Sequence, residues 1–190
     1  LRNPERASWK EIIPESDATI TGVDYVGHQL AVAYLRDAKS EVRLFGTDGK
    51  LARTVELDGI GTARGFSGRA DDPETFYSFA SFATPTSVYR YNVSTGEKTL
   101  LFRSKVAMNP ADFEVKPVFY TSKDGTKVPL NIIAKKGVKL DGRKPTLLYG
   151  YGGYGVNQQT GFSGGRRRLG LDAGGRFRIA TQRGGGPNGH

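Results

Sequence analysis

The sequence predicts a mixed fold, in which about two blades of an all-β propeller precede a sheet with parallel strands. Residues 1–105 contain many short strand-like runs, and a hairpin pattern recurs among them. After residue 106, apolar runs alternate with a short helical segment, which is typical of an α/β sheet. We therefore expect two domains, a partial β-propeller over 1–105 and an incomplete second domain over 106–190.

Short strand-like runs follow one another through the first of these domains. They are rich in β-branched and aromatic residues and are bounded by Gly, Asp, Ser and Thr. Two pairs of runs flank turn sequences, TDG at 47–49 and STG at 94–96, and we expect a hairpin at each. The expected strands are 19–23, 29–35, 41–45, 51–57, 76–82, 87–91 and 98–102.

The two hairpins form an internal repeat. Residues 42–45 (VRLF) precede the first turn as residues 88–91 (VYRY) precede the second, and Gly49 and Gly96 lie 47 residues apart. Antiparallel strands that repeat at this period are typical of propeller blades. Closed propellers have about four to eight blades. We therefore expect part of a larger ring, with open sheet edges and marginal stability.

The second domain begins with an expected strand pair at 113–120 and 127–134, around a turn at 122–125. A polar turn at 135–143 leads to a strand at Thr146. Residues 166–174 predict a short helix that ends at paired glycines, and residues 176–182 predict the next strand. This order of elements predicts parallel pairing in the sheet.

Residues 144–154 (KPTLLYGYGGY) form the stretch most indicative of a site. A short apolar run ends in closely spaced tyrosines and glycines, which is the pattern of a buried strand that leads into a loop. Ligands bind at such carboxyl ends of strands in α/β sheets. Glycines allow a ligand to approach the backbone, and tyrosines offer phenolic hydrogen-bond donors.

Several motifs stand in order after residue 120: KDGTKVP at 123–129, KKG at 135–137, LDG at 140–142, YGYGG at 149–153, DAGG at 172–175 and RGGG at 183–186. Together they resemble the start of the peptidase domain of the prolyl oligopeptidase family. The resemblance implies that 106–190 is the N-terminal part of an α/β-hydrolase domain. It also implies a serine-type endopeptidase that, when intact, hydrolyses short peptides after proline through an acyl-enzyme.

The same resemblance implies two site residues. In this family the second tyrosine of the Tyr-Gly-Tyr-Gly-Gly motif donates its hydroxyl to the oxyanion of acyl transfer, which assigns that role to Tyr151. Tyr154 stands where an aromatic residue lines the pocket for the substrate proline. The family usually has Phe there, whereas Tyr154-Gly155 resembles oligopeptidase B, which cleaves after basic residues. Both specificities therefore stay open.

A nucleophile, an acid and a base are not evident in these 190 residues. GFSGG at 161–165 matches the Gly-x-Ser-x-Gly pattern, but residues 156–160 are too polar for the buried strand that a nucleophile elbow needs, so we interpret it as a Gly/Ser loop. The histidines are His28, expected in a surface turn, and the terminal His190. We expect the chain to be inactive alone, and a non-catalytic propeller-type binding protein remains an alternative.

The composition narrows the classes of function and partner that remain. The net charge is +9, but the basic residues are scattered apart from residues 166–168, which favours a solvated basic surface over nucleic-acid binding. No cluster of residues has the spacing of metal ligands, and there is no cysteine. The aspartates at 48, 71 and 72 (Asp48, Asp71 and Asp72) are of the kind expected in turns. We expect a short peptide substrate, no nucleic-acid or membrane partner, no cofactor, a monomer when intact, and a cytoplasmic or periplasmic location.

Overall fold

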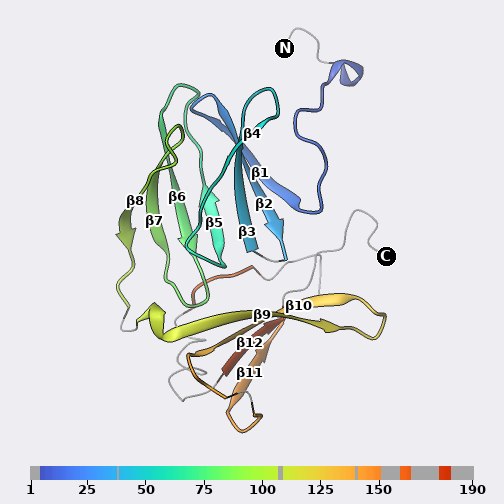
Figure 1. Cartoon of the computed structure of the whole chain (residues 1–190), viewed down its shortest axis with the longest axis vertical. Coiled ribbons are helices and arrows are strands. Elements are labelled where there is room, and N and C mark those ends of the chain that lie inside the picture. Colours follow the sequence, from blue (N-terminus) through green and yellow to red (C-terminus); the bar gives the residue numbers. More distant parts are fainter. Residues whose placement is uncertain are drawn as a thin grey trace.

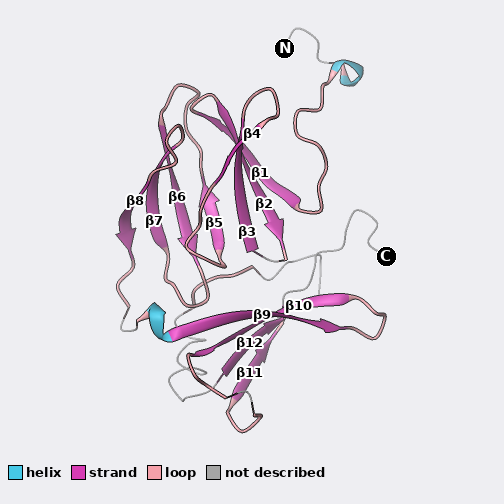
Figure 2. Ribbon diagram, viewed as in Figure 1, coloured by secondary structure: helices cyan, strands magenta, loops and turns pink. Residues whose placement is uncertain are grey.

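A computed structural model describes residues 5–37, 39–106, 109–139, 141–150, 159–163 and 176–180. These residues form three four-stranded sheets. Figure 1 shows the first two sheets side by side and the third sheet beneath them. The helices of this part of the chain are two 3₁₀ turns, η1 (Arg6–Ser8) and η2 (Pro110–Asp112), so its regular structure is almost entirely strand (Figure 2).

The first sheet is an antiparallel meander in the order β1-β2-β3-β4. Its strands are β1 (Thr19–Val26), β2 (Gln29–Arg36), β3 (Lys39–Phe45) and β4 (Leu51–Thr54). β2 is apolar because both of its faces are covered. Ala31 packs toward the second sheet, whereas Val32 and Tyr34 pack against Ile13 of the N-terminal segment.

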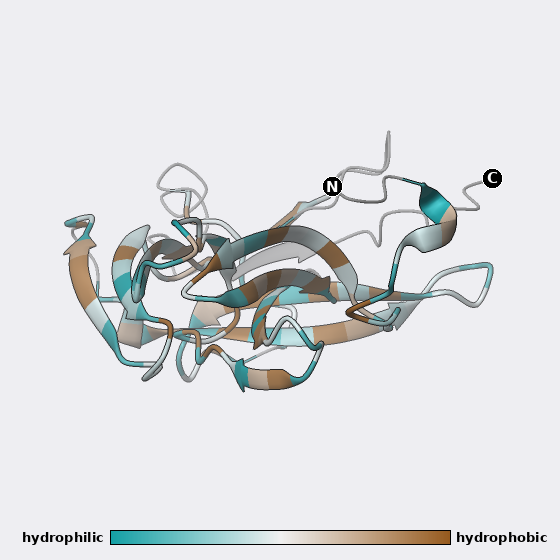
Figure 3. Ribbon diagram, turned by 90° about the horizontal axis from the view of Figure 1, so that it is seen from above, coloured by the Kyte–Doolittle hydropathy of each residue, from teal (hydrophilic) through white to brown (hydrophobic). Residues whose placement is uncertain are grey.

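The second sheet repeats this topology in the order β5-β6-β7-β8. Its strands are β5 (Thr62–Gly65), β6 (Glu74–Ala80), β7 (Ser87–Asn92) and β8 (Lys98–Arg103). In β6 the buried residues Thr75, Tyr77 and Phe79 alternate with more exposed ones. Figure 3 shows that hydrophobic and hydrophilic stretches are interspersed along the strands of the molecule. Two consecutive four-stranded meanders confirm the predicted pair of propeller-like blades.

The main hydrophobic core lies between the two blades. Phe66 stacks on Tyr77 with ring centroids 4.7 Å apart, and Tyr77 stacks on Tyr89 at 5.1 Å. Each such aromatic pair adds about 0.5–1.5 kcal/mol beyond the burial of its area. The core comprises Val26, Ala31, Val42, Leu44, Val55, Ala63, Phe66, Tyr77, Phe79, Tyr89, Tyr91 and Val93.

Both predicted hairpin turns are present. Gly49 in the β3–β4 turn and Gly96 in the β7–β8 turn have φ values of 83° and 79°, in the left-handed region that glycine adopts readily. Asp48 closes the first turn by accepting a hydrogen bond from the backbone N–H of Lys50 at 3.1 Å. The repeat therefore corresponds to the third and fourth strands of each blade.

The first strand of the second blade, β5, is one that the sequence pattern does not predict. It has four residues and no apolar run, and it is a strand because it pairs with β6, where Arg64 lies opposite Ser78. β4 in turn is shorter than the predicted 51–57. It ends at Thr54 because Val55 and Leu57 turn into the core between the blades.

The third sheet has the order β11-β12-β10-β9, with β9 (Phe113–Thr121), β10 (Lys127–Lys135), β11 (Thr146–Tyr149) and β12 (Arg176–Ala180). The predicted strand pair is confirmed as β9 and β10, which are antiparallel. β10 and β12 are also antiparallel, so the predicted parallel pairing holds for β11 and β12 alone. The predicted helix at 166–174 lies outside the described residues.

A second apolar cluster joins the third sheet to the second blade. Ala83 of the β6–β7 connection is buried with Phe113 and Ile133, at the start of β9 and in β10. Phe82, Val115 and Tyr149 pack against this cluster. The third sheet is therefore packed onto the loop end of the second blade.

Candidate functional site

The two residues to which the sequence assigns roles, Tyr151 and Tyr154, lie outside the described residues. The described chain stops before them at Gly150 and begins again at Gln159. The structure describes the chain on either side of this segment.

On the N-terminal side, β11 leads toward the predicted site. Tyr149, its last residue, is half-buried against the cluster of Ala83, Phe113 and Ile133. The strand itself is not buried as its apolar sequence predicts, because Leu147 and Leu148 are 38% and 67% exposed. β11 lies at the edge of its sheet and pairs with β12, and neither leucine belongs to an apolar cluster of the described residues.

On the C-terminal side, residues 159–163 run alongside β5 of the second blade. Arg64 donates a hydrogen bond from Nη2 to Oε1 of Gln159 at 3.0 Å, and the Oγ1 atoms of Thr62 and Thr160 are 3.3 Å apart. Thr160 is buried, at 2% exposed. β5 thus connects the propeller-like part to the chain that follows the predicted site.

Two open hollows meet at this contact. One, of about 340 Å³, is lined by β5, Ala80 and the segment that contains Gln159 and Phe162. The other, of about 380 Å³, lies between β1 and β5, and Gln159 and Arg64 also line it. Thr62, Arg64 and Gln159 line both of them.

The Gly-x-Ser-x-Gly match at 161–165 lies partly in this segment. Its described residues, Gly161 to Ser163, follow Thr160 without forming a strand. A nucleophile elbow is a turn between a strand and a helix. The local backbone therefore agrees with the interpretation of this match as a loop.

The structure confirms that His28 occupies a surface turn. It follows β1 with a φ of 56°, and its Nε2 atom lies 3.1 Å from Oδ1 of Asp71. The side chains of His28 and Asp71 are 70% and 88% exposed. Asp72 also serves a turn, since it accepts a hydrogen bond from the backbone N–H of Arg69 at 2.9 Å.

A polar cluster that the sequence does not predict lies between the blades, around Asp58. This carboxylate accepts hydrogen bonds from the Tyr89 hydroxyl and from Lys98 Nζ, the latter at 2.7 Å. Arg103 Nη2 donates to the Tyr89 hydroxyl at 3.1 Å, and Lys98 also donates to the backbone carbonyl of Glu56 at 2.9 Å. The cluster fixes the connection between the blades to β7 and β8.

The pKa values in this cluster shift in opposite directions. Burial disfavours the charged form of Asp58, but the hydrogen bonds from Lys98 and Tyr89 outweigh it, so its pKa lies below the usual value. Burial and the hydrogen bond to Asp58 raise the pKa of Tyr89. Burial raises that of Tyr77 as well. The cluster thus holds a carboxylate and neutral phenols.

In the sequence, Asp58-Gly59 has only the pattern of an ordinary turn, so this cluster could not be expected from it.

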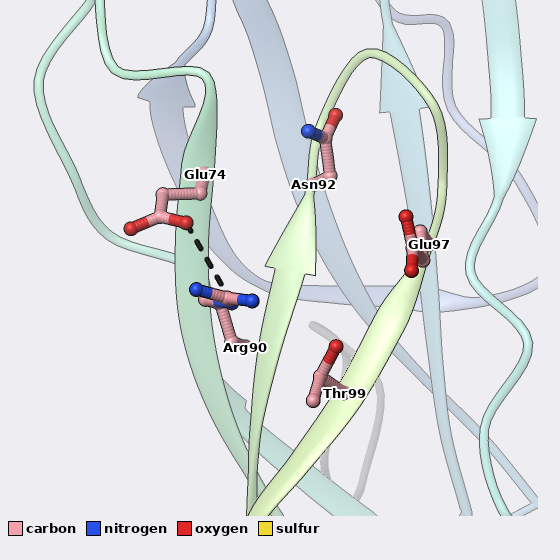
Figure 4. Close-up of a pocket in the computed structure, with 5 residues that line it drawn as sticks. All are labelled: Glu74, Arg90, Asn92, Glu97 and Thr99. Atoms are coloured by element: carbon pink, nitrogen blue, oxygen red, sulfur yellow. Dashed lines mark ion pairs between the residues drawn. The ribbon is translucent and has the colours of Figure 1, made fainter.

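A small polar hollow lies on the face of the second blade that points away from the core between the blades. It has a volume of about 170 Å³ and is lined by Glu74, Arg90, Asn92, Glu97 and Thr99 (Figure 4). Glu74 and Arg90 form an ion pair with a distance of 3.7 Å between Oε2 and Nε, and both side chains are about half exposed. Exposed pairs of this kind contribute little to stability.

Two further findings concern the described residues as a set. They include no group of three or more His, Cys, Asp or Glu side chains that could hold a metal ion. Among them, no helix has the length and apolarity needed to cross a membrane.

Comparison with known proteins decides the family. A family model described as the N-terminal beta-propeller domain of prolyl oligopeptidase matches residues 1–104. The chain belongs to the prolyl oligopeptidase family. Membership agrees with the motifs after residue 120 and with the two blades.

Members of the prolyl oligopeptidase family are similar to this chain along its whole length. The prolyl endopeptidase of Elizabethkingia meningoseptica is 37% identical over 189 residues, which are 100% of this chain and 26% of the relative. A solved structure from an analysis of two prolyl endopeptidases has a TM-score of 0.89 and 47% identity, over 99% of this chain and 28% of that one. Prolyl oligopeptidase B from Galerina marginata, bound to a 25mer macrocyclization substrate, has a TM-score of 0.81 at 31% identity, over 93% of this chain and 25% of that one.

The chain therefore spans about a quarter of the length of these prolyl oligopeptidase relatives. Oligopeptidase B, the alternative suggested by Tyr154, is a more distant neighbour. The enzyme from Trypanosoma brucei, with covalently bound antipain, has a TM-score of 0.77 and 27% identity, over 94% of this chain and 27% of that one.

Proposed function

We propose that this chain is part of a serine-type endopeptidase that hydrolyses short peptides after proline. The observation that carries the proposal is the likeness to a prolyl endopeptidase structure, with 47% identity and a TM-score of 0.89 over 99% of the chain. The smaller identity to oligopeptidase B, 27%, favours proline over basic residues as the specificity.

We further propose that residues 1–105 are a partial β-propeller and that residues 106–190 are the N-terminal part of an α/β-hydrolase domain. Two observations support this division. The family model for the propeller ends at residue 104. After it, β11 and β12 are parallel neighbours, and a parallel pair needs a crossover connection of a dozen or more residues. The chain between Tyr149 and Arg176 is long enough for one.

In this proposal the chain supplies part of the acyl-transfer site. Tyr151 donates its hydroxyl to the negative charge that develops on the scissile carbonyl oxygen, a contribution worth about 2.7–4 kcal/mol for one donor. Tyr154 lines the pocket for the proline ring. Neither His28, which is exposed in a blade turn, nor Ser163, which follows no described strand, is suited to the triad. We expect the 190 residues alone to be inactive.

The partner that this function requires is a short peptide. One relative, Galerina marginata prolyl oligopeptidase B, is known bound to a 35mer hydrolysis and macrocyclization substrate. We propose a peptide substrate for this chain's intact form as well, with no nucleic-acid partner, no membrane partner and no cofactor, and with a monomeric, cytoplasmic state. Salt-titrated binding to nucleic acid checks the charge argument, since we expect no affinity beyond that of a generic cation.

The experiment uses the protein encoded by the complete reading frame that contains these residues. Its turnover of a Gly-Pro reporter is compared with turnover of an arginine reporter, each with and without a serine-directed inhibitor. We expect inhibitor-sensitive cleavage after proline, and the same preference in Tyr154→Phe, which carries the residue usual in the family. Preferential cleavage after arginine would establish the oligopeptidase B-like alternative, and no cleavage of either reporter would refute the peptidase proposal.

A further inference from the structure

The hollow of about 380 Å³ between the blades is lined by residues of both β1 and β5. Each of these is the terminal strand of its sheet, so one edge of its backbone has no neighbouring strand among the described residues. The backbone groups along such an edge can hydrogen-bond to an extended peptide. The volume is within the range of small-molecule sites, about 300–1,000 Å³. The hollow therefore offers both space and backbone groups for a short peptide.

The first blade contributes a negative charge to this hollow through Asp24. In the register of β1 and β2, Asp24 lies opposite Ala31, which is part of the core between the blades. Residues directly opposite each other in an antiparallel pair point to the same face of the sheet, so the Asp24 side chain is directed toward the second blade. It is half-buried and lines the hollow, and none of the ion pairs among the described residues includes it.

The second blade contributes a positive charge through Arg64. Its Nη2 atom donates a hydrogen bond to the neutral amide of Gln159 at 3.0 Å, and Gln159 lines the same hollow. Arg64 takes part in none of the ion pairs that the described residues form. Hydrogen bonds from a guanidinium to a carboxylate are about twice as strong as those between neutral groups. A ligand carboxylate is therefore a better acceptor for Arg64 than the Gln159 amide.

We propose that this hollow binds short peptides as zwitterions, with the α-amino group at Asp24 and the α-carboxylate at Arg64. These two are the charged residues among the described residues that line the hollow, and they do not pair with each other. A simple anion would satisfy Arg64 alone and would be repelled by Asp24, whereas a peptide zwitterion complements both charges. The inference goes beyond the proposed function and does not rest on it, because binding needs no catalysis.

Gly22 provides a way to fill the hollow while the fold is kept. It lines the hollow from β1, and a Cβ built on it would have no described heavy atom within 4 Å. Its φ is not in the positive range where a side chain would be strained. Gly22→Leu should therefore fold and place its side chain in the space that the peptide needs.

The first test measures the binding of triglycine, which carries both charges and contains no proline, to the protein from the complete reading frame. The protein is first treated with a serine-directed inhibitor, so that a peptidase site is blocked. Ligand-observed NMR titrations give the Kd of triglycine, N-acetyl-triglycine and triglycine amide. We expect saturable binding of triglycine with a Kd of about 1 mM. Each blocked peptide should bind about 3- to 10-fold more weakly, because it has lost one of its charges.

The second test assigns each charge of the peptide to its residue. In Asp24→Asn, triglycine and N-acetyl-triglycine should bind equally, and in Arg64→Gln, triglycine and its amide should bind equally, because the partner of the missing charge is gone. Gly22→Leu should abolish saturable binding. Asp71→Asn and Arg90→Gln are the matched controls, since neither residue lines this hollow, and both should bind triglycine as the wild type does. Circular dichroism checks that every variant is folded.

The remaining outcomes would overturn the inference. They are triglycine that does not saturate at about ten times the expected Kd, a folded Gly22→Leu that binds it unchanged, and equal Kd values for the three peptides. Acetate that displaces triglycine at equal concentration would show a simple anion site instead. The proposed function fails separately: a wild type that binds triglycine but cleaves neither reporter refutes the peptidase alone, and one that cleaves after proline without binding triglycine refutes this site alone.

Discussion

Replacing Asp58 by asparagine tests whether the polar cluster between the blades stabilises the fold. The carboxylate accepts hydrogen bonds from Lys98 and Tyr89, and its side chain is 31% exposed. A hydrogen bond to a charged group contributes about 1.5–3 kcal/mol. Partial exposure of both partners reduces the ionic part, so we expect Asp58→Asn to lower the free energy of unfolding by about 1–2 kcal/mol.

The pH dependence of this loss gives the sharper test. The folded-state pKa of Asp58 lies below its ordinary value of 3.8. A carboxyl with a lowered folded pKa stabilises the fold fully above its unfolded pKa, and the stabilisation declines as the pH falls through the folded pKa. The difference between wild type and Asp58→Asn should therefore be constant from neutral pH down to about 5 and shrink below about 4.

Thermal unfolding followed by circular dichroism measures the effect. For a chain of this size, 1–2 kcal/mol corresponds to a Tm decrease of about 2–8 °C. Asp71→Asn is the control, because Asp71 is an aspartate that is 88% exposed, and its replacement should change stability by less than about 0.5 kcal/mol. The reasoning is refuted if Asp58→Asn unfolds like Asp71→Asn, or if its Tm deficit is the same at pH 7 and below pH 4.

Three further predictions concern the turns, the core and the isolated chain. Gly49→Ala should lower the free energy of unfolding by at least about 1 kcal/mol more than Gly125→Ala. Both glycines have a positive φ, but of the two only Gly49 would bring a Cβ into overlap with a backbone carbonyl, that of Ile12. Equal Tm losses in the two variants would contradict this. Tyr77→Phe should not lower the free energy of unfolding, because the buried Tyr77 hydroxyl has no hydrogen-bond partner among the described residues. Tyr89→Phe should lower it by about 1–2 kcal/mol, because the Tyr89 hydroxyl is hydrogen-bonded to Asp58 and Arg103. Denaturant titrations of the two variants measure the difference. The 190-residue chain should not turn over a Gly-Pro reporter, and inhibitor-sensitive turnover by the purified chain would show this expectation to be wrong.

The blades could be predicted from the sequence because their signals are local. The hairpin turns at Gly49 and Gly96 carry their own glycines, and the alternation of buried and exposed residues in β6 is visible in the sequence. β5 could not be predicted, because Thr62 to Gly65 form a strand only through pairing with β6. Long-range pairing has no local sequence signature.

The site could be predicted only in part, for the same reason. The motifs around 144–154 point to a strand end and a loop, and β11 does end at Tyr149. The apolar run predicts burial for Leu148, whereas this residue is 67% exposed and belongs to no apolar cluster of the described residues. The contact of Arg64 with Gln159 joins residues 95 positions apart, and no spacing rule could indicate it.

The central claim is that this chain carries the oxyanion donor of a prolyl peptidase. The most direct measurement compares kcat on a Gly-Pro reporter for wild type and Tyr151→Phe, in the protein from the complete reading frame. We predict proline cleavage by the wild type, and a kcat about 100- to 1,000-fold lower in the variant with little change in KM. A wild type that does not cleave the reporter, or a Tyr151→Phe variant that keeps its kcat, would contradict the account.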